Sequence, residues 1–145
     1  GGFNGQVTLS SVERFDPRAG AWAPAPPMSV ARVDASVGVA AGKLSVCGGL
    51  DDSGQPLGLA ERLDPAAGAW AALLGMLERR CRAAAGVLQG RLYLCGGRDD
   101  ARHLRSVESL VLVPSVGLWE PGPPLPRARA GATAAVASGR LYVCG

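Results

Sequence analysis

The sequence lacks any long run of apolar residues. A transmembrane helix needs about 18 consecutive apolar residues, and no stretch of this 145-residue chain approaches that length. The N-terminus also lacks a basic segment followed by an apolar one, so we expect no signal peptide in this sequence. Apolar residues make up 48% and charged residues 19% of the chain, which excludes disorder as its main state. We therefore expect a folded cytoplasmic protein that does not bind membranes.

Metal-binding patterns are also missing. The chain has a single histidine, His103, and no Cys-x-x-Cys pair among its four cysteines. A zinc site needs four convergent ligands. We therefore predict that the chain holds no metal and no cofactor.

A large excess of one charge is missing as well. The 15 basic and 12 acidic residues are interspersed and give a net charge of +3. Such a small, mixed charge argues against nucleic-acid binding. Lys43 is the one lysine and isoleucine is absent, and we interpret the dominance of arginine as a bias in nucleotide composition.

Glycine and proline, in contrast, are abundant, with 21 and 11 residues respectively. Both disfavour helices, so this content favours short strands joined by turns. The chain also repeats with a period of about 48 residues: double glycines begin at 1, 48 and 96, tryptophans lie at 22, 70 and 119, arginines at 32, 80 and 129, single glycines at 42, 90 and 139, leucines at 44, 92 and 141, and cysteines at 47, 95 and 144. An acidic series follows at 13, 61 and 108. Each period predicts four short strands, which must stack on neighbouring copies to bury both faces of their sheet, as in a β-propeller.

One segment conflicts locally with this interpretation. Residues 77–88 are alanine-rich and carry a Glu78–Arg82 pair at helical spacing. The same positions in the other copies have strand character, so the repeat register predicts a strand here too.

The repeated motifs resemble those of the kelch family. The segments SVERFDPRAGAW and AERLDPAAGAW are similar to its third strand and following tryptophan, and GKLSVCGG, GRLYLCGG and GRLYVCG to its second strand and double glycine. The resemblance implies an all-β fold, a partial kelch β-propeller of two full blades and two half blades. We expect outer strands of a first blade in 1–28, a second blade in 29–76, a third in 77–125, and inner strands of a fourth in 126–145.

Two further expectations concern the ring and the third copy. Propellers close with four to eight blades, so we expect these blades to belong to a six-bladed ring, which a homodimer could close by pairing its half blades. In the third copy Glu108 and Trp119 are eleven residues apart, where the other copies have nine. We therefore expect a longer and less regular hairpin there.

The cysteines divide into a repeated series and one exception. Cys47, Cys95 and Cys144 occupy one strand position in three copies, where a thiol acts as a small apolar group. Cys81 lies outside the series beside three arginines, which could lower its pKa. A reactive thiol and an inert loop thiol both remain open from the sequence.

The resemblance places partner contacts in the loops after the double glycines, 50–58 and 98–105, and in the segments before each first strand, 29–34, 77–82 and 126–131. Recurrence of one arginine in all copies also permits a structural role, such as bonding loop carbonyls. Arginine clusters favour acidic or phosphorylated segments, a preference that the neighbouring aspartates weaken. The predicted partner-binding residues are Arg32, Asp34, Asp51, Arg79, Arg80, Arg82, Arg98, Asp99, Asp100, Arg102, His103 and Arg129.

The resemblance implies a protein-interaction module rather than an enzyme, and we predict no catalytic residues. The specific expectation is substrate recognition, of a short peptide or degron, in a BTB–kelch adaptor of a cullin-3 ubiquitin ligase, with cullin-3 contacted through a BTB domain that this sequence does not contain. An actin-binding kelch protein and a sugar-modifying kelch enzyme of the epimerase or oxidase type are the alternatives. The copper site of the oxidase type is excluded within this sequence, because Tyr93 and Tyr142 are equivalent strand residues and His103 has no second histidine beside it.

Overall fold

The computed structural model describes residues 1–112 and 117–145, and within these ranges it contains strands and no helix. The segment with local helical character, 77–88, ends in a strand, as the repeat register predicts. The strands are β1 (Gly2–Phe3), β2 (Thr8–Leu9), β3 (Val12–Asp16), β4 (Ala21–Ala25), β5 (Ser36–Ala40), β6 (Lys43–Cys47), β7 (Ala60–Asp64), β8 (Ala69–Ala72), β9 (Ala84–Leu88), β10 (Arg91–Cys95), β11 (Val107–Leu112), β12 (Gly117–Gly122), β13 (Thr133–Ala137) and β14 (Arg140–Cys144).

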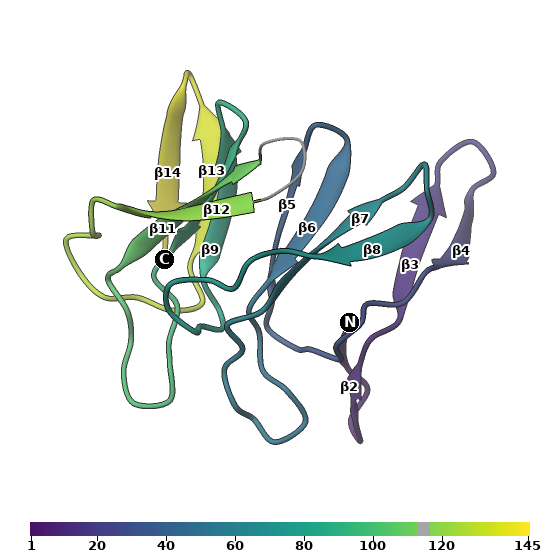
Figure 1. The fold of residues 1–145 in the computed structure, drawn as a ribbon, viewed down its shortest axis with the longest axis horizontal. Coiled ribbons are helices and arrows are strands. Elements are labelled where there is room, and N and C mark those ends of the chain that lie inside the picture. Colours follow the sequence, from purple (N-terminus) through teal and green to yellow (C-terminus); the bar gives the residue numbers. More distant parts are fainter. Residues whose placement is uncertain (113–116) are drawn as a thin grey trace.

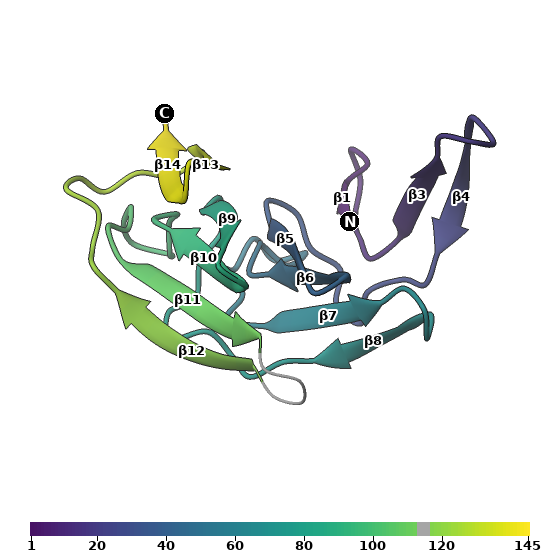
Figure 2. The ribbon, with the colours of Figure 1, turned by 90° about the horizontal axis from the view of Figure 1, so that it is seen from above.

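The strands form antiparallel sheets in the order of the chain. Two sheets have four strands, β5-β6-β7-β8 and β9-β10-β11-β12, and the pairs β3-β4 and β13-β14 form two-stranded sheets on either side of them. Seen from above, the sheets fan out side by side as consecutive blades (Figure 2). The predicted two full blades and two half blades are confirmed. The exact blade boundaries, closure into a six-bladed ring and pairing of half blades in a homodimer stay predictions.

Three tight turns explain the series of single glycines. The inner hairpins β5-β6, β9-β10 and β13-β14 turn at Ala41–Gly42, Gln89–Gly90 and Ser138–Gly139, where both residues of each pair have positive φ, between 48° and 75°. This is the type I′ geometry, which suits the twist of a two-residue hairpin and favours glycine. These turns lie together at one end of the blades (Figure 1).

The outer hairpin of the third copy is longer than its equivalent. Strands β11 and β12 have six residues each, whereas β7 has five and β8 has four. The turn expected to be irregular falls at 113–116, outside the described residues.

The inner strands of adjacent blades approach closely at a glycine. A Cβ added to Gly38 of β5 would lie 2.4 Å from Cδ1 of Leu92, and one added to Gly86 of β9 would lie 2.4 Å from Cδ1 of Leu141. Leu92 is completely buried. The leucine of one blade therefore occupies the space that a side chain would need in the preceding blade.

Two of the three recurring tryptophans also join neighbouring blades. The indole Nε1–H of Trp70 donates to the carbonyl of Pro26 at 2.8 Å, and that of Trp119 donates to the carbonyl of Leu74, also at 2.8 Å. Both acceptors follow the outermost strand of the preceding blade. Each indole thus combines apolar contact with one directed bond across the interface.

Candidate functional site

Loops from successive blades gather on the side opposite the tight turns. The loops β1-β2, β6-β7 and β10-β11 project in the same direction (Figure 1). The segment entering each blade lies beside them, because Val33 bridges to Leu50 and Cys81 bridges to Arg98. We call this surface the loop face, and it comprises residues 29–35, 48–59, 77–83, 96–106 and 126–132.

The double glycines allow these loops to meet the next blade. Gly48 has a φ of 63°, and a Cβ there would lie 2.2 Å from the carbonyl oxygen of Arg80. At Gly96 a Cβ would lie 2.5 Å from the carbonyl oxygen of Arg129. The following glycine donates to the same carbonyls, from Gly49 to Arg80 at 3.0 Å and from Gly97 to Arg129 at 2.8 Å. Only a residue without a side chain permits both the positive φ and this approach.

A buried arginine supports the loop face in blade two. The side chain of Arg32 is 1% exposed, and its Nη2 lies 2.8 Å from Oε1 of Glu61, which is 3% exposed. Its Nη1 donates to the carbonyls of Gly48 at 2.7 Å and Leu59 at 3.2 Å. The second carboxylate oxygen of Glu61 accepts from both the N–H and the hydroxyl of Ser29 at 2.8 Å. Among the described residues, the other partners of this ion pair are two backbone carbonyls and Ser29, and none of them is charged.

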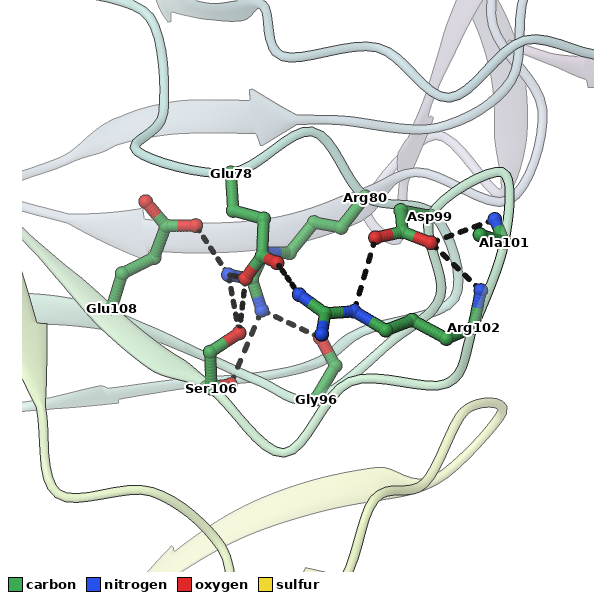
Figure 3. A network of polar contacts seen from close by, with 8 residues as sticks. All are labelled: Glu78, Arg80, Gly96, Asp99, Ala101, Arg102, Ser106 and Glu108. Atoms are coloured by element: carbon green, nitrogen blue, oxygen red, sulfur yellow. Dashed lines mark hydrogen bonds and ion pairs between the residues drawn. The ribbon is translucent and has the colours of Figure 1, made fainter.

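Blade three repeats the same cluster around Arg80 (Figure 3). Nη1 of Arg80 donates to the carbonyls of Gly96 at 2.6 Å and Ser106 at 3.2 Å, and Nη2 lies 2.7 Å from Oε1 of Glu108. The other oxygen of Glu108 accepts from the N–H of Leu77 at 2.8 Å. Burial raises the pKa of Glu108, and the nearby Arg80 opposes this shift.

The blade-three cluster, unlike its blade-two equivalent, includes further charged side chains of the loop face. Glu78 accepts from Ser106 Oγ at 2.5 Å and from Arg80 Nη2 at 3.4 Å through Oε2, and from Arg102 Nη2 at 3.3 Å through Oε1. Asp99 Oδ1 accepts from the N–H groups of Ala101 and Arg102, each at 2.8 Å, and these bonds lower the pKa of Asp99. A chain of polar contacts thus runs from the core to the exposed side chain of Arg102 (Figure 3).

The recurring arginines of the loop face bond backbone carbonyls, and two of the three are buried. Arg32 and Arg80 are buried, and the half-buried Arg129 donates to the carbonyl of Gly145 at 2.8 Å. All three bond loop carbonyls, which is the structural role that their recurrence suggested. Partner binding by these three stays a prediction, and the burial of Arg32 and Arg80 keeps their guanidinium groups from an incoming partner in this arrangement of the loops.

Asp34 and Arg82 link two blades at the surface. Arg82 Nε donates to Asp34 Oδ2 at 2.7 Å, and the backbone N–H of Arg82 donates to the carbonyl of Asp34 at 2.9 Å. Both residues have left-handed backbones, with φ of 56° and 55°. This conformation costs a residue with a Cβ about 1–2 kcal/mol. The equivalent position in the next blade is Gly131, whose N–H donates to the carbonyl of Arg82 at 2.9 Å.

The other predicted residues, apart from Asp51, lie on or beside the β10-β11 loop. Arg79 and Asp100 approach to 3.9 Å, and Arg98, Arg102 and His103 are exposed. Asp51 lies apart from them on the neighbouring β6-β7 loop, where its Oδ1 accepts from the N–H groups of Ser53 and Gln55. The structure therefore brings the blade-three residues together and leaves Asp51 in a separate, acidic loop.

The Cys81 thiol is buried in this structure. Its side chain is 1% exposed and its Sγ lies 3.7 Å from the carbonyl oxygen of Arg98. Burial raises the pKa of Cys81 more than the neighbouring Arg98 and Arg82 lower it. Burial likewise raises the pKa of Cys47 to about 12. Burial and the raised pKa of Cys81 favour the alternative of an inert loop thiol over a reactive one.

Sequence reasoning missed three residues of the site. Glu78 and Ser106 extend the Arg80 cluster, and Arg105 is exposed at the end of the same loop. Their signal is their departure from the repeat, since the blade-two equivalents of Glu78 and Ser106 are Val30 and Leu59.

The described residues contain neither a membrane-spanning helix nor a cluster of metal ligands. None of the described residues belongs to a helix long and apolar enough to span a membrane. Over the same ranges, no three side chains of histidine, cysteine, aspartate or glutamate are grouped as metal ligands would be.

The repeats are similar to those of known proteins in sequence and in fold. A family model described as the Kelch motif matches residues 1–29 and 79–126, a little over half of the chain. Human Kelch-like protein 35 is 48% identical over 54 residues, a match that covers 37% of this chain and 9% of that protein. The solved structure of YjhT superimposes on 94% of the chain with a TM-score of 0.76 and 16% sequence identity. The chain spans 48% of YjhT, and a similarity at this identity shows the fold alone.

Proposed function

The chain belongs to the kelch-motif family, and we propose that it is a protein-interaction module whose loop face binds a segment of a partner protein. The observation that carries this proposal is the contrast between the buried clusters and the surface above them. The clusters repeat from blade to blade, whereas the exposed charges around Arg82, Arg98 and Arg102 do not. Repeated residues account for the fold, so the unrepeated ones are available for recognition.

The support beneath these charges makes the surface rigid. Arg80 fixes both ends of the β10-β11 loop by donating to the carbonyls of Gly96 and Ser106. The carboxylate of Asp99 fixes the middle of the loop by accepting from the backbone N–H of Ala101. A loop ordered before binding loses less conformational entropy when a partner arrives. This arrangement favours recognition of an extended segment.

We further propose that the partner is a substrate of a cullin-3 ubiquitin ligase and that the chain is the recognition part of a BTB–kelch adaptor. The kelch motifs and the partial match to Kelch-like protein 35 support this proposal. Cullin-3 would be contacted through a BTB domain outside this sequence. Actin binding and a sugar-modifying enzyme stay alternatives, and a cytoplasmic location stays a prediction.

Capture of partners by the full chain tests the proposal. A triple variant with Arg82→Ala, Arg98→Ala and Arg102→Ala should lose a partner that the parent chain retains. The matched control removes the same charge from Arg14, Arg18 and Arg140, which lie on β3, the β3-β4 turn and β14. Equal retention of every partner by both triple variants would contradict recognition at the loop face.

A further inference from the structure

A hollow on the loop face lies between blade three and the segment that enters the next blade. It encloses about 280 Å³ and its polar lining comes from Glu78, Arg102, His103, Arg105 and Ser106. The entering segment is held beside it, because Leu125 N–H donates to the carbonyl of Arg105 at 2.7 Å.

The single carboxylate in this lining is already occupied. Both oxygens of Glu78 are bonded, one to Arg102 and the other to Ser106 and the buried Arg80. A carboxylate whose oxygens are engaged by two arginines offers little attraction to an incoming cation. The hollow is therefore a poor site for a basic side chain.

The cations of the lining, in contrast, have unused donors. Arg102 bonds Glu78 through Nη2, and its Nε lies 3.6 Å from Asp99 Oδ2, which leaves its Nη1 without a hydrogen-bond acceptor among the described residues. Arg105 has no carboxylate within ion-pair distance in the described part of the chain. A guanidinium presents five N–H donors in a planar fork that matches a carboxylate or phosphate.

Asp99 and Glu78 hold Arg102 in place for such a ligand. Their contacts approach its guanidinium from two directions and anchor the side chain to the rigid Arg80 cluster (Figure 3). The equivalent loop of blade two carries Asp51 and Asp52 and no arginine. The feature is thus specific to blade three.

We propose that this hollow binds one anionic side chain, a carboxylate or a phosphate, of the partner segment, with Arg105 and Arg102 donating to it and His103 beside them. The proposal rests on the proposed function of the loop face and adds the chemistry of the bound group. Glu78 holds Arg102 through Nη2, but its negative charge repels the anionic ligand and lowers the affinity.

Three short peptides of neutral sequence, identical except for a central phosphoserine, glutamate or serine, are the probes. Titration of the full chain, followed by NMR of the arginine Nε–Hε groups, should shift the signals of Arg102 and Arg105 with the two anionic peptides and not with the serine peptide. Tighter binding of the phosphoserine or of the glutamate peptide identifies the favoured anion. The absence of saturable shifts with either anionic peptide would overturn the proposal.

Two variants and a control assign the effect to the hollow. Arg105→Gln should weaken anion binding about tenfold, the usual value of one charge-assisted hydrogen bond. Glu78→Gln should strengthen it several-fold, a gain that misfolding cannot produce. Arg18→Gln, with the same charge change in the β3-β4 turn, should leave it unchanged. Loss of affinity in Glu78→Gln, or equal effects of Arg105→Gln and Arg18→Gln, would contradict the assignment.

This outcome is separable from the proposed function. Partner capture that depends on Arg82 and Arg98 without anion binding in the hollow would refute the anion site alone. Anion binding without partner capture would refute the proposed function and keep the site.

Discussion

Arg32 and Glu61 form an ion pair inside blade two, with Nη2 and Oε1 2.8 Å apart and side chains 1% and 3% exposed. Its blade-three equivalent, Arg80 with Glu108, has nearly the same distance, 2.7 Å, but a second carboxylate, Glu78, also contacts that arginine. The two clusters share a position in the repeat and differ in how many acidic groups balance the buried charge. This difference leads to the first two predictions.

Glu61→Gln should destabilise the chain more than Glu108→Gln. The first change leaves the buried Arg32 without a carboxylate among the described residues, and breaking a buried pair in this way costs about 3–5 kcal/mol. The second leaves Arg80 with Glu78 at 3.4 Å. Urea denaturation at neutral pH measures both free energies of unfolding. Equal losses would show that Glu78 does not compensate Arg80.

The stability difference between the parent chain and Glu108→Gln should depend on pH. Because burial raises the pKa of Glu108, the folded state keeps this proton to a higher pH than the unfolded state does. The free energy of unfolding of the parent chain should therefore fall, relative to the variant, as the pH rises from about 4.5 through the raised pKa. Urea denaturation of both proteins across this range gives the difference. A difference that stays constant or changes with the opposite sign would be inconsistent with a raised pKa.

Gly38→Ala should destabilise the interface between blades two and three. The new Cβ would lie 2.4 Å from Cδ1 of the buried Leu92 and 3.1 Å from Cγ2 of Val87, and overpacking of this kind costs about 1–3 kcal/mol. Gly58→Ala is the control, because the nearest atom to its Cβ is 3.7 Å away. Thermal denaturation should show a lower Tm for the first variant alone. Similar Tm values for both would indicate that the blades are not packed as described.

Native alkylation should spare Cys47 and Cys81. A pKa of about 12 for Cys47 leaves on the order of one thiolate in ten thousand at pH 8, and Cys81 is buried with a raised pKa. Cys144 is exposed and should react with iodoacetamide under the same conditions. Mass spectrometry before and after unfolding in urea distinguishes the sites. Rapid native modification of Cys81 would revive the reactive-thiol interpretation.

The repeat made the fold predictable, because one register fixes strands, turns and blade interfaces together. The register predicted a strand in 77–88 despite the local helical pattern. It also assigns Gly42 and Trp119 to positions that recur in the other copies. It could also have paired two of its own series, since Arg32 and Glu61 lie 29 residues apart and Arg80 and Glu108 lie 28 apart. The sequence alone does not show that these side chains meet. The arginine lies in the segment before the first strand of the blade, and the glutamate lies on the third strand of the same blade.

The surface was less predictable than the framework. Glu78 and Arg105 depart from the repeat, but a single out-of-register charge on a loop is usually solvated, so this departure alone does not select them as site residues. The burial of Arg80 depends on the fold of loop 96–106 around it. Its recurrence suggested a supporting role, and the structure shows that Arg80 is buried whereas Arg79 and Arg82 are exposed.

Site-specific photocrosslinking tests the central claim most directly. A benzoylphenylalanine placed at position 103, exposed on the loop face, should yield a defined covalent adduct with a partner protein in cells. The same group at position 18, in the exposed β3-β4 turn away from the loop face, should yield none. An adduct at 103 that disappears when Arg82, Arg98 and Arg102 are changed to alanine is the predicted result. The same adduct at both positions, or at 18 alone, would contradict recognition by the loop face.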